Sequence, residues 1–240
     1  IRCLNRFSSK LSIMQISMII FVLLLFHTSK TENYRFMFTG LVQEVGRVKE
    51  IDFNDQDIRL HIEVDGDFLN GITLGESISV SGVCLTVTEK SPLSFWSDVS
   101  AETLKTTTIR FWQVGEEVNL ERALTPSSHM GGHIVTGHVD GVGEVLTREK
   151  DGRSWRFLFR IPNELSRYIA RKGSVCIDGT SLTVNLVDGC DFEINIIPKT
   201  MASTTFCSYV SGSKVNIEVD LVARYLERLS LYDGEPEKDF

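Results

Sequence analysis

Cysteine is scarce in this chain of 240 residues. The five cysteines are odd in number, lie far apart and form no CxxC pair; they are Cys3, Cys84, Cys176, Cys190 and Cys207. A disulfide framework needs an even set of cysteines, and a structural zinc site usually needs closely paired ones. The pattern therefore excludes both and indicates free thiols in a reducing compartment.

Basic residues are also too few to give a positive surface. The formal net charge is −7, and residues 1–36 hold five basic side chains against Glu32 alone. The remaining chain therefore carries 20 basic and 31 acidic residues, a net charge of −11. A surface this acidic repels phosphate backbones, so nucleic acid is not expected as a partner.

Long apolar runs are missing too. The apolar stretch 11–26 contains a pure run of only nine residues, Met18–Phe26, which is too short to span a bilayer. With basic residues before it, the stretch resembles a signal peptide or an organelle-targeting leader. The alternative is translated upstream sequence, with Met37 as the true start. Residues 1–36 are therefore set aside. The compartment stays open: cytoplasmic if Met37 is the start, organellar (a plastid) if the leader is genuine. No membrane partner is expected for the mature domain.

Several common catalytic motifs are absent. The sequence contains no P-loop, no GxGxxG, no HExxH and no GxSxG. Most nucleotide-dependent and metal-dependent chemistries therefore lack support.

What the sequence does contain is a long internal repeat. Shifted by 97 positions, the chain aligns with itself without a gap over more than 80 positions. The matches include Thr39-Gly40 with Thr136-Gly137, Val45-Gly46 with Val142-Gly143, Leu85-Thr86-Val87 with Leu182-Thr183-Val184, Phe95 with Phe192, and Val118-Asn119 with Val215-Asn216. A period this long indicates two copies of a whole domain rather than a solenoid.

Each copy has the pattern of a β-barrel. Residues 58–64 alternate apolar and polar side chains, which is typical of a strand with one buried face. Short runs of this kind, separated by Gly, Asp and Asn, favour small antiparallel barrels. With the boundary between the copies near 128–134, we predict an N-terminal extension (1–36), a first barrel (37–133), a second barrel (134–218) and a C-terminal helix with its tail (219–240).

The last segment changes to a helical period. Leu221, Val222, Tyr225, Leu226 and Leu229 fall on one helical face, and Asp220 is placed to cap the helix. Such a face needs an apolar partner. Either its own domain or another subunit could provide that partner, and the sequence does not decide between them.

The most distinctive repeated motif is a glycine turn that leads into a strand, Ser81–Val87 and Asp178–Val184. We expect this turn to expose backbone N–H groups and small polar side chains that could pair with the edge of a heterocycle. Cys84 lies opposite Ser181, and both positions could carry a weak nucleophile or a hydrogen-bond donor.

The segment 129–138 holds three of the five histidines, but its spacing does not suit a metal site. Gly131-Gly132 separates His129 from His133, and on a strand His133 and His138 would point to opposite faces. We expect a structural turn plus one functional histidine, and no metal. His138 stands opposite Leu41, so it breaks the symmetry of the repeat where the two halves could divide their tasks.

Taken together, these residues resemble the riboflavin synthase family. The similarity covers about residues 37–230 and is carried by Met37-Phe-Thr-Gly-Leu-Val, the two turn motifs, residues 131–140, Ile197-Pro-Lys-Thr and Val215-Asn-Ile-Glu-Val-Asp. Each motif alone is weak, but the set in this order is specific.

The resemblance implies two tandem six-stranded Greek-key barrels, each binding one lumazine, and a C-terminal helix that forms a homotrimer. It implies the conversion of two 6,7-dimethyl-8-ribityllumazine molecules to riboflavin and 5-amino-6-ribitylaminouracil without a cofactor. The working site would lie between the first barrel of one subunit and the second barrel of its neighbour. Lumazine synthase is a further candidate partner.

The resemblance also implies site residues. Catalytic roles fall on Ser77, Cys84, His138, Ser181, Thr183 and Asp220, with His138 assisting proton transfer. Substrate contacts fall on Gly40, Leu41, Val42, Cys84, Leu85, Thr86, Asp98, Val99, Ser100, Ala101, Glu102, Thr103, Gly137, His138, Val139, Lys172, Ser181, Leu182, Thr183, Asn195, Ile196, Ile197, Pro198, Lys199 and Thr200. Asp220 could instead be only a helix cap, and Lys172 only a solvated turn residue.

A non-catalytic lumazine- or flavin-binding antenna protein of the same fold is the alternative. Such proteins typically lose polar residues in one half. Here the polar residues of both halves persist, which favours the enzyme.

Overall fold

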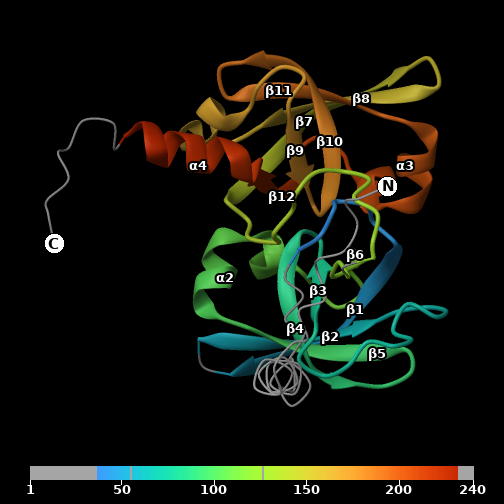
Figure 1. The fold of residues 1–240 in the computed structure, drawn as a ribbon. Helices are drawn as coiled ribbons and strands as arrows, with labels where there is room; N and C mark the ends of the chain where they lie inside the picture. Colours follow the sequence, from blue (N-terminus) through green and yellow to red (C-terminus); the bar gives the residue numbers. More distant parts are fainter. Residues whose placement is uncertain (1–36, 55, 126, 232–240) are drawn as a thin grey trace, which may run out of the picture. The chain divides into compact units, whose positions relative to one another are not determined.

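The computed structural model describes residues 37–54, 56–125 and 127–231, and shows two six-stranded barrels followed by a short helix (Figure 1). This confirms the predicted fold class. The expectations about a leader or upstream sequence in residues 1–36 lie outside the described residues, as does the tail from 232 to 240.

The first barrel closes in the order β1-β2-β5-β4-β3-β6, with every pair antiparallel. Its strands are β1 (Glu44–Asn54), β2 (Asp57–Glu63), β3 (Ser77–Val80), β4 (Val83–Lys90), β5 (Ser94–Val99) and β6 (Glu117–Arg122); helix α2 (Ala101–Thr106) and the 3₁₀ turn η1 (Thr108–Phe111) connect β5 to β6. Because β2 pairs with β5 rather than with β3, the connection is a Greek key.

The second barrel repeats the strands and helices of the first, element by element. Its elements are β7 (Gly141–Asp151), β8 (Ser154–Arg160), β9 (Ser174–Ile177), β10 (Thr180–Asp188), β11 (Asp191–Ile196), α3 (Pro198–Ser203), η3 (Thr205–Ser208) and β12 (Lys214–Val219), with an added 3₁₀ turn η2 (Asn163–Tyr168). Each counterpart begins 97 positions after its partner in the first barrel, and the β-bulges near Val48 and Val145 recur at the same offset. The repeat in the sequence is therefore a repeat of register, not only of strand order.

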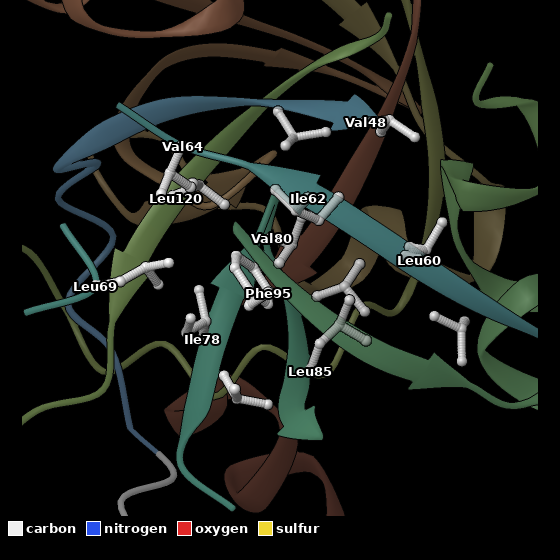
Figure 2. Packing of buried hydrophobic residues seen from close by; sticks show 14 of the residues in the cluster. Val48, Leu60, Ile62, Val64, Leu69, Ile78, Val80, Leu85, Phe95 and Leu120 are labelled. Carbon is white, nitrogen blue, oxygen red and sulfur yellow. The ribbon is translucent and has the colours of Figure 1, made fainter. Parts of the chain in front are cut away.

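Buried and outward-facing side chains alternate along the strands, and the buried ones fill the interior of each barrel. In β2 the apolar side chains of Ile58, Leu60 and Ile62 point into the core while the intervening residues face outward. Figure 2 shows Leu60 and Ile62 with Phe95, which lies on the neighbouring strand β5. Burying such a side chain contributes about 1.5–3 kcal/mol relative to leaving it exposed.

The second core is more aromatic than the first. Phe157, Phe159 and Phe206 stand where the first barrel has Leu60, Ile62 and Ile109. The rings pack in stacked and edge-on pairs, with centroids 5.9 Å apart for Phe157–Phe159 and 5.6 Å for Phe157–Phe206. The same backbone thus accommodates two different sets of core side chains.

The two glycine turns are buried, which corrects the expectation that they present their own N–H groups to a ligand. Ser81-Gly82 and Asp178-Gly179 all have positive φ, which is the geometry of two-residue type I′ hairpins. Gly82 and Gly179 pack against each other, since a Cβ on Gly82 would lie only 2.7 Å from the Gly179 nitrogen. These turns therefore join the barrels, and the ligand-facing candidates begin further along the strands.

Two buried asparagines complete the junction between the barrels. Asn119 donates from Nδ2 to the Asp178 carbonyl (2.8 Å) and accepts at Oδ1 from the Thr205 N–H (2.9 Å). Asn216 makes the reciprocal pair of bonds, to Ser81 (2.8 Å) and from Thr108 (2.7 Å). Such fully satisfied amides fix the two barrels to each other in one arrangement.

Helix α4 (Leu221–Ser230) follows β12 directly and is capped by Asp220, whose carboxylate accepts from the Val222 N–H (2.9 Å). The predicted cap is therefore confirmed. The helix is tied to the second barrel by polar contacts of Glu227 with Arg167 and Tyr168, and of Arg224 with Asp140.

The apolar face of α4 stays uncovered within this chain. Val222, Tyr225, Leu226 and Leu229 are each 57–65% exposed, so the helix does not dock on its own domain through that face. Among the residues that the structure describes, no helix has the length and apolar character needed to span a bilayer.

Candidate active site

The predicted site residues divide into two similar sets, one for each barrel, which we call half-sites. The first half-site combines the start of β4 (Cys84–Thr86), the end of β5 with α2 (Asp98–Thr103) and the segment Gly137–Val139, which leads into the second barrel. The Cys84 N–H donates to the Gly137 carbonyl (2.8 Å), and a Cβ on Gly137 would lie 2.6 Å from the Cys84 Cβ. Leu85, Val99 and Val139 pack in one cluster beneath it.

The second half-site is built the same way from the other barrel. It combines Ser181–Thr183 of β10, Asn195–Thr200 of β11 and α3, and the segment Gly40–Val42, which leads into the first barrel. The Ser181 N–H donates to the Gly40 carbonyl (2.8 Å), and a Cβ on Gly40 would lie 2.5 Å from the Ser181 Cβ. The two lead-in segments are therefore exchanged. Gly137–Val139 leads into the second barrel but packs on the first, and Gly40–Val42 leads into the first barrel but packs on the second. We call these segments straps.

In the first half-site, Cys84 lies beside Ser77 of the neighbouring strand β3. Burial raises the pKa of the Cys84 thiol, and a hydrogen bond with Ser77 opposes that rise. The thiol is therefore protonated at neutral pH. Of the two roles that the sequence left open, this favours a hydrogen-bond donor over a thiolate nucleophile.

The second half-site contains a histidine that sequence reasoning did not select. His133 Nδ1 lies 2.6 Å from the Ser181 hydroxyl. Its other ring nitrogen, Nε2, is buried and has no hydrogen-bond partner among the described residues. Burial lowers the pKa of His133, and the charge of Asp220 opposes this. A neutral imidazole thus faces Ser181, with one nitrogen left to accept or donate.

The sequence carried one signal for His133, the preceding Gly131-Gly132. A Cβ on Gly132 would lie 1.9 Å from the Thr39 carbonyl oxygen and 2.9 Å from the Ser181 Cβ. Only glycine can pass so close to the strap. The glycine pair is therefore the feature that brings His133 to Ser181.

Asp220 lies near the second half-site of its own chain, because its charge acts on His133. Asp220 also caps α4, so the same residue can be a helix cap and lie near the site. His138 lies on the exposed side of the first half-site, directly after Gly137. Its counterpart in the second half-site, Leu41, is 49% exposed.

Lys172 lies at the turn before β9 and has a left-handed backbone, with φ of 68°. Its N–H donates to the Val184 carbonyl (2.8 Å), next to Thr183. The first barrel has Gly75 at this position, with φ of 88°. Lysine is thus kept at a position where glycine would be less strained.

Similar proteins match this architecture. The lumazine binding domain model matches residues 39–123 and again residues 136–220. The chain is 43% identical over 202 residues to the riboflavin synthase of Photobacterium phosphoreum, covering 84% of this chain and 93% of that one. It is 45% identical over 201 residues to the riboflavin synthase of Brucella abortus (strain 2308), covering 82% of this chain and 99% of that one.

The chain belongs to the riboflavin synthase family. The resemblance seen in the motifs is thereby confirmed, and riboflavin synthase activity in riboflavin biosynthesis is its function. A riboflavin synthase from Schizosaccharomyces pombe (strain 972 / ATCC 24843) is 39% identical over 196 residues, covering 80% of this chain and 93% of that one.

Solved structures share the fold as well. LumP complexed with 6,7-dimethyl-8-(1'-D-ribityl) lumazine superposes with a TM-score of 0.70 at 28% identity, covering 76% of this chain and 98% of that chain. LumP complexed with riboflavin superposes with a TM-score of 0.71 at 31% identity, over the same shares of the two chains.

The geometry separates the predicted site residues of this riboflavin synthase family member into two groups. Ser77, Cys84 and His138 lie at the first half-site, and Ser181, Thr183 and Asp220 lie at the second. Within the described residues, no group of three or more His, Cys, Asp or Glu side chains is placed to hold a metal ion. Which of these residues contact substrate stays a prediction.

Proposed function

We propose that the protein converts two molecules of 6,7-dimethyl-8-ribityllumazine into riboflavin and 5-amino-6-ribitylaminouracil by transfer of a four-carbon unit. The observation that carries this proposal is the pair of half-sites. They lie at equivalent positions of two similar barrels but have different polar side chains. A reaction between two identical substrates needs one pocket for a donor and another for an acceptor. The two products together contain the atoms of two substrates, so no oxidant or other co-reactant is consumed.

The chemistry starts at the C7 methyl group of one lumazine. Its proton is acidic because the resulting anion delocalises into the ring system. Loss of this proton gives a carbon nucleophile, while addition of a second nucleophile prepares the other lumazine. Holding two rings in register supplies much of the rate by proximity, and proton transfer by positioned side chains supplies the next part.

Roles for the side chains follow from their surroundings. At the first half-site, His138 assists proton transfer and the protonated thiol of Cys84 donates a hydrogen bond. At the second half-site, the hydroxyl of Ser181 contacts the substrate and is oriented by His133, whose imidazole is neutral because burial lowers its pKa. Leu41 and Ile197, 49% and 57% exposed, provide apolar surface for the ring of the substrate.

The working site lies between chains. We propose that the first half-site of one subunit faces the second half-site of its neighbour in a homotrimer. The exposed apolar face of α4 supports an assembly, because an uncovered row of large apolar side chains is typical of an interaction site. In this arrangement the barrels at 37–133 and 134–218 remain separate binding domains, and 219–240 joins the subunits.

Incubation of the purified protein with the lumazine tests the reaction. We expect one riboflavin for every two lumazines consumed, followed by absorbance and by chromatography of both products. A bound fluorescent lumazine that persists without product would contradict the proposal and support the antenna protein instead.

A substitution at the first half-site tests the assigned proton transfer. His138→Ala should lower turnover and change the pH dependence of the rate, because the imidazole is removed while the backbone of the strap stays. Arg153→Ala, at the exposed turn between β7 and β8, is the control. An unchanged pH–rate profile for His138→Ala would remove this residue from proton transfer.

A further inference from the structure

Two buried glutamates outside the predicted site set hold the straps. Glu121, on β6, is 3% exposed, and Glu218, on β12, is 4% exposed. They occupy equivalent positions, 97 residues apart. Buried carboxylates are rare unless their oxygens are hydrogen-bonded, so their partners identify what they do.

The partners of Glu218 lie at the start of the strap of the first half-site: Thr136, directly before the strap, and Gly137, its first residue. Oε1 accepts from the Thr136 N–H (2.7 Å) and from the Thr136 hydroxyl (2.8 Å), and Oε2 accepts from the Gly137 N–H (2.9 Å). Burial raises the pKa of Glu218, and these bonds oppose the rise. Because both oxygens only accept, the geometry fits the ionised carboxylate.

Glu121 holds the other strap in the same way. Oε1 accepts from the Thr39 N–H and from the Thr39 hydroxyl, both at 2.7 Å, and Oε2 accepts from the Gly40 N–H (2.9 Å). The bonds are made to backbone groups directly before the residues that face the half-sites. Each carboxylate therefore fixes the path of a strap at the point where the strap begins.

The straps differ at their middle residue, and this separates the two glutamates in function. After Gly137 comes His138, whose charge joins the hydrogen bonds from Thr136 and Gly137 in opposing the rise that burial causes in the pKa of Glu218. After Gly40 comes Leu41, an apolar side chain. The Cys84 N–H also donates to the Gly137 carbonyl, so Glu218 and Cys84 hold the two peptide groups on either side of the Gly137 Cα.

We propose that Glu218 is a positioning residue for His138 at the first half-site, and that Glu121 is the equivalent positioning residue for Leu41 at the second. This inference rests on the proposed reaction, in which His138 moves a proton and Leu41 supports a substrate ring. A shift of a reacting group by about 1 Å can cost about 100-fold in rate, so a carboxylate that fixes the strap affects turnover through His138.

Glu218→Gln and Glu121→Gln form a matched pair. Glutamine has the same shape but can accept on only one of its two terminal atoms, so each variant loses part of one clamp. Because the bonds and burial of the two glutamates are equivalent, we expect similar losses of thermal stability. Glu218→Gln should lower kcat by about tenfold or more with KM nearly unchanged, whereas Glu121→Gln should raise KM by several-fold with kcat nearly unchanged.

Amide hydrogen exchange tests the clamps apart from turnover. In the full-length protein, exchange at Thr136 and Gly137 should become faster in Glu218→Gln, and exchange at Thr39 and Gly40 faster in Glu121→Gln, each by about tenfold or more. Equal changes of kcat and KM in the two variants would overturn the positioning roles and leave only a structural one. Unchanged exchange at the straps would overturn the clamps themselves. If the wild type formed no riboflavin, the proposed function would fail, and the exchange rates alone would decide the clamps.

Discussion

The two barrels of this chain have the same backbone and different half-sites. Strand bounds, bulges, type I′ turns and clamping glutamates recur at a constant offset of 97 residues. Among the positions predicted for the site, the first half-site against the second has Cys84 against Ser181, His138 against Leu41, Ser100 against Ile197, Glu102 against Lys199 and Gly75 against Lys172. The same backbone therefore carries two different sets of side chains at the predicted half-sites, as it does in the two cores.

The comparison extends to charge. The first half-site has Asp98 and Glu102 where the second has Asn195 and Lys199. Asp98 is paired with Arg59, while Glu102 is exposed on α2. The first half-site is therefore more polar and more acidic, and the second more apolar and more basic, as expected of pockets with separate tasks.

The largest difference between the barrels is that only the second carries a helix such as α4. Val222→Glu combined with Leu226→Glu should break the proposed assembly, because charges on an apolar interface are costly to bury. Turnover should fall by about 10⁴-fold as the paired substrates lose their alignment. Sedimentation velocity and riboflavin formation check this. Phe53→Glu, at an 82% exposed position on the first barrel, is the control. An active monomer would refute the site between chains.

A buried carboxyl distinguishes the second turn from the first. Burial raises the pKa of Asp178 to about 7 from 3.8, although Tyr209 and Asn216 donate to it, whereas the first turn has Ser81. Because the folded state binds this proton more tightly than the unfolded state, the contribution of this carboxyl to the free energy of unfolding is fully present below about pH 4 and is lost as the pH rises to about 7. The loss is about 4 kcal/mol.

Asp178→Asn should remove this part of the pH dependence, since asparagine does not ionise and suits a type I′ turn. Urea unfolding at several pH values between 4 and 8 measures the effect. Ser81→Ala, in the equivalent turn, should leave the slope unchanged. A slope in Asp178→Asn equal to that of the wild type would contradict the assignment.

Exchanging the residues that open β4 and β10 sharpens the comparison of the half-sites. Cys84→Ser should slow turnover by about fivefold and weaken lumazine binding less, because a hydroxyl still donates but is shorter than the thiol. Steady-state kinetics together with fluorescence titration of lumazine check this. Ser181→Cys is the reverse exchange. Wild-type turnover in Cys84→Ser would exclude a chemical role for the thiol.

The smallest effect concerns the left-handed residue before β9. Lys172→Gly should increase the free energy of unfolding by about 1 kcal/mol, because glycine adopts positive φ without strain. Gly75→Lys should lower it by a similar amount. Urea unfolding measures both. If Lys172→Gly is more stable but binds lumazine less tightly, the lysine is retained for the ligand; equal binding would assign it to the turn alone.

Much of the fold could be predicted from the sequence because its determinants are local or periodic. The alternation in residues 58–64 matches β2, and Asp220 before an amphipathic run matches the cap of α4. Because the sequence repeats, the fold of the second barrel could be predicted from that of the first. The structure adds that Ser77 and Cys84, both among the predicted site residues, are hydrogen-bonded across β3 and β4.

What escaped prediction depends on contacts between distant parts of the chain. The exchanged straps, the packing of Gly82 on Gly179 and the bond from Ser181 to His133 join residues that no periodic pattern links. The turn motif was therefore interpreted as exposed although it is buried, and His133 was taken for part of a structural turn. Glu121 and Glu218 are identical across the repeat, but no local pattern in the sequence indicates that both are buried against the straps.

The exchanged straps bear on how the chain arose. Phe38 and Val135, 97 positions apart, donate to each other across the junction, as the same residue of two subunits would around a two-fold axis. A lone ancestral barrel would have lacked the strap that completes its pocket and the partner for its buried asparagine. The chain thus has the internal symmetry of a two-fold dimer within one polypeptide, and each of its two copies can differ in sequence from its twin.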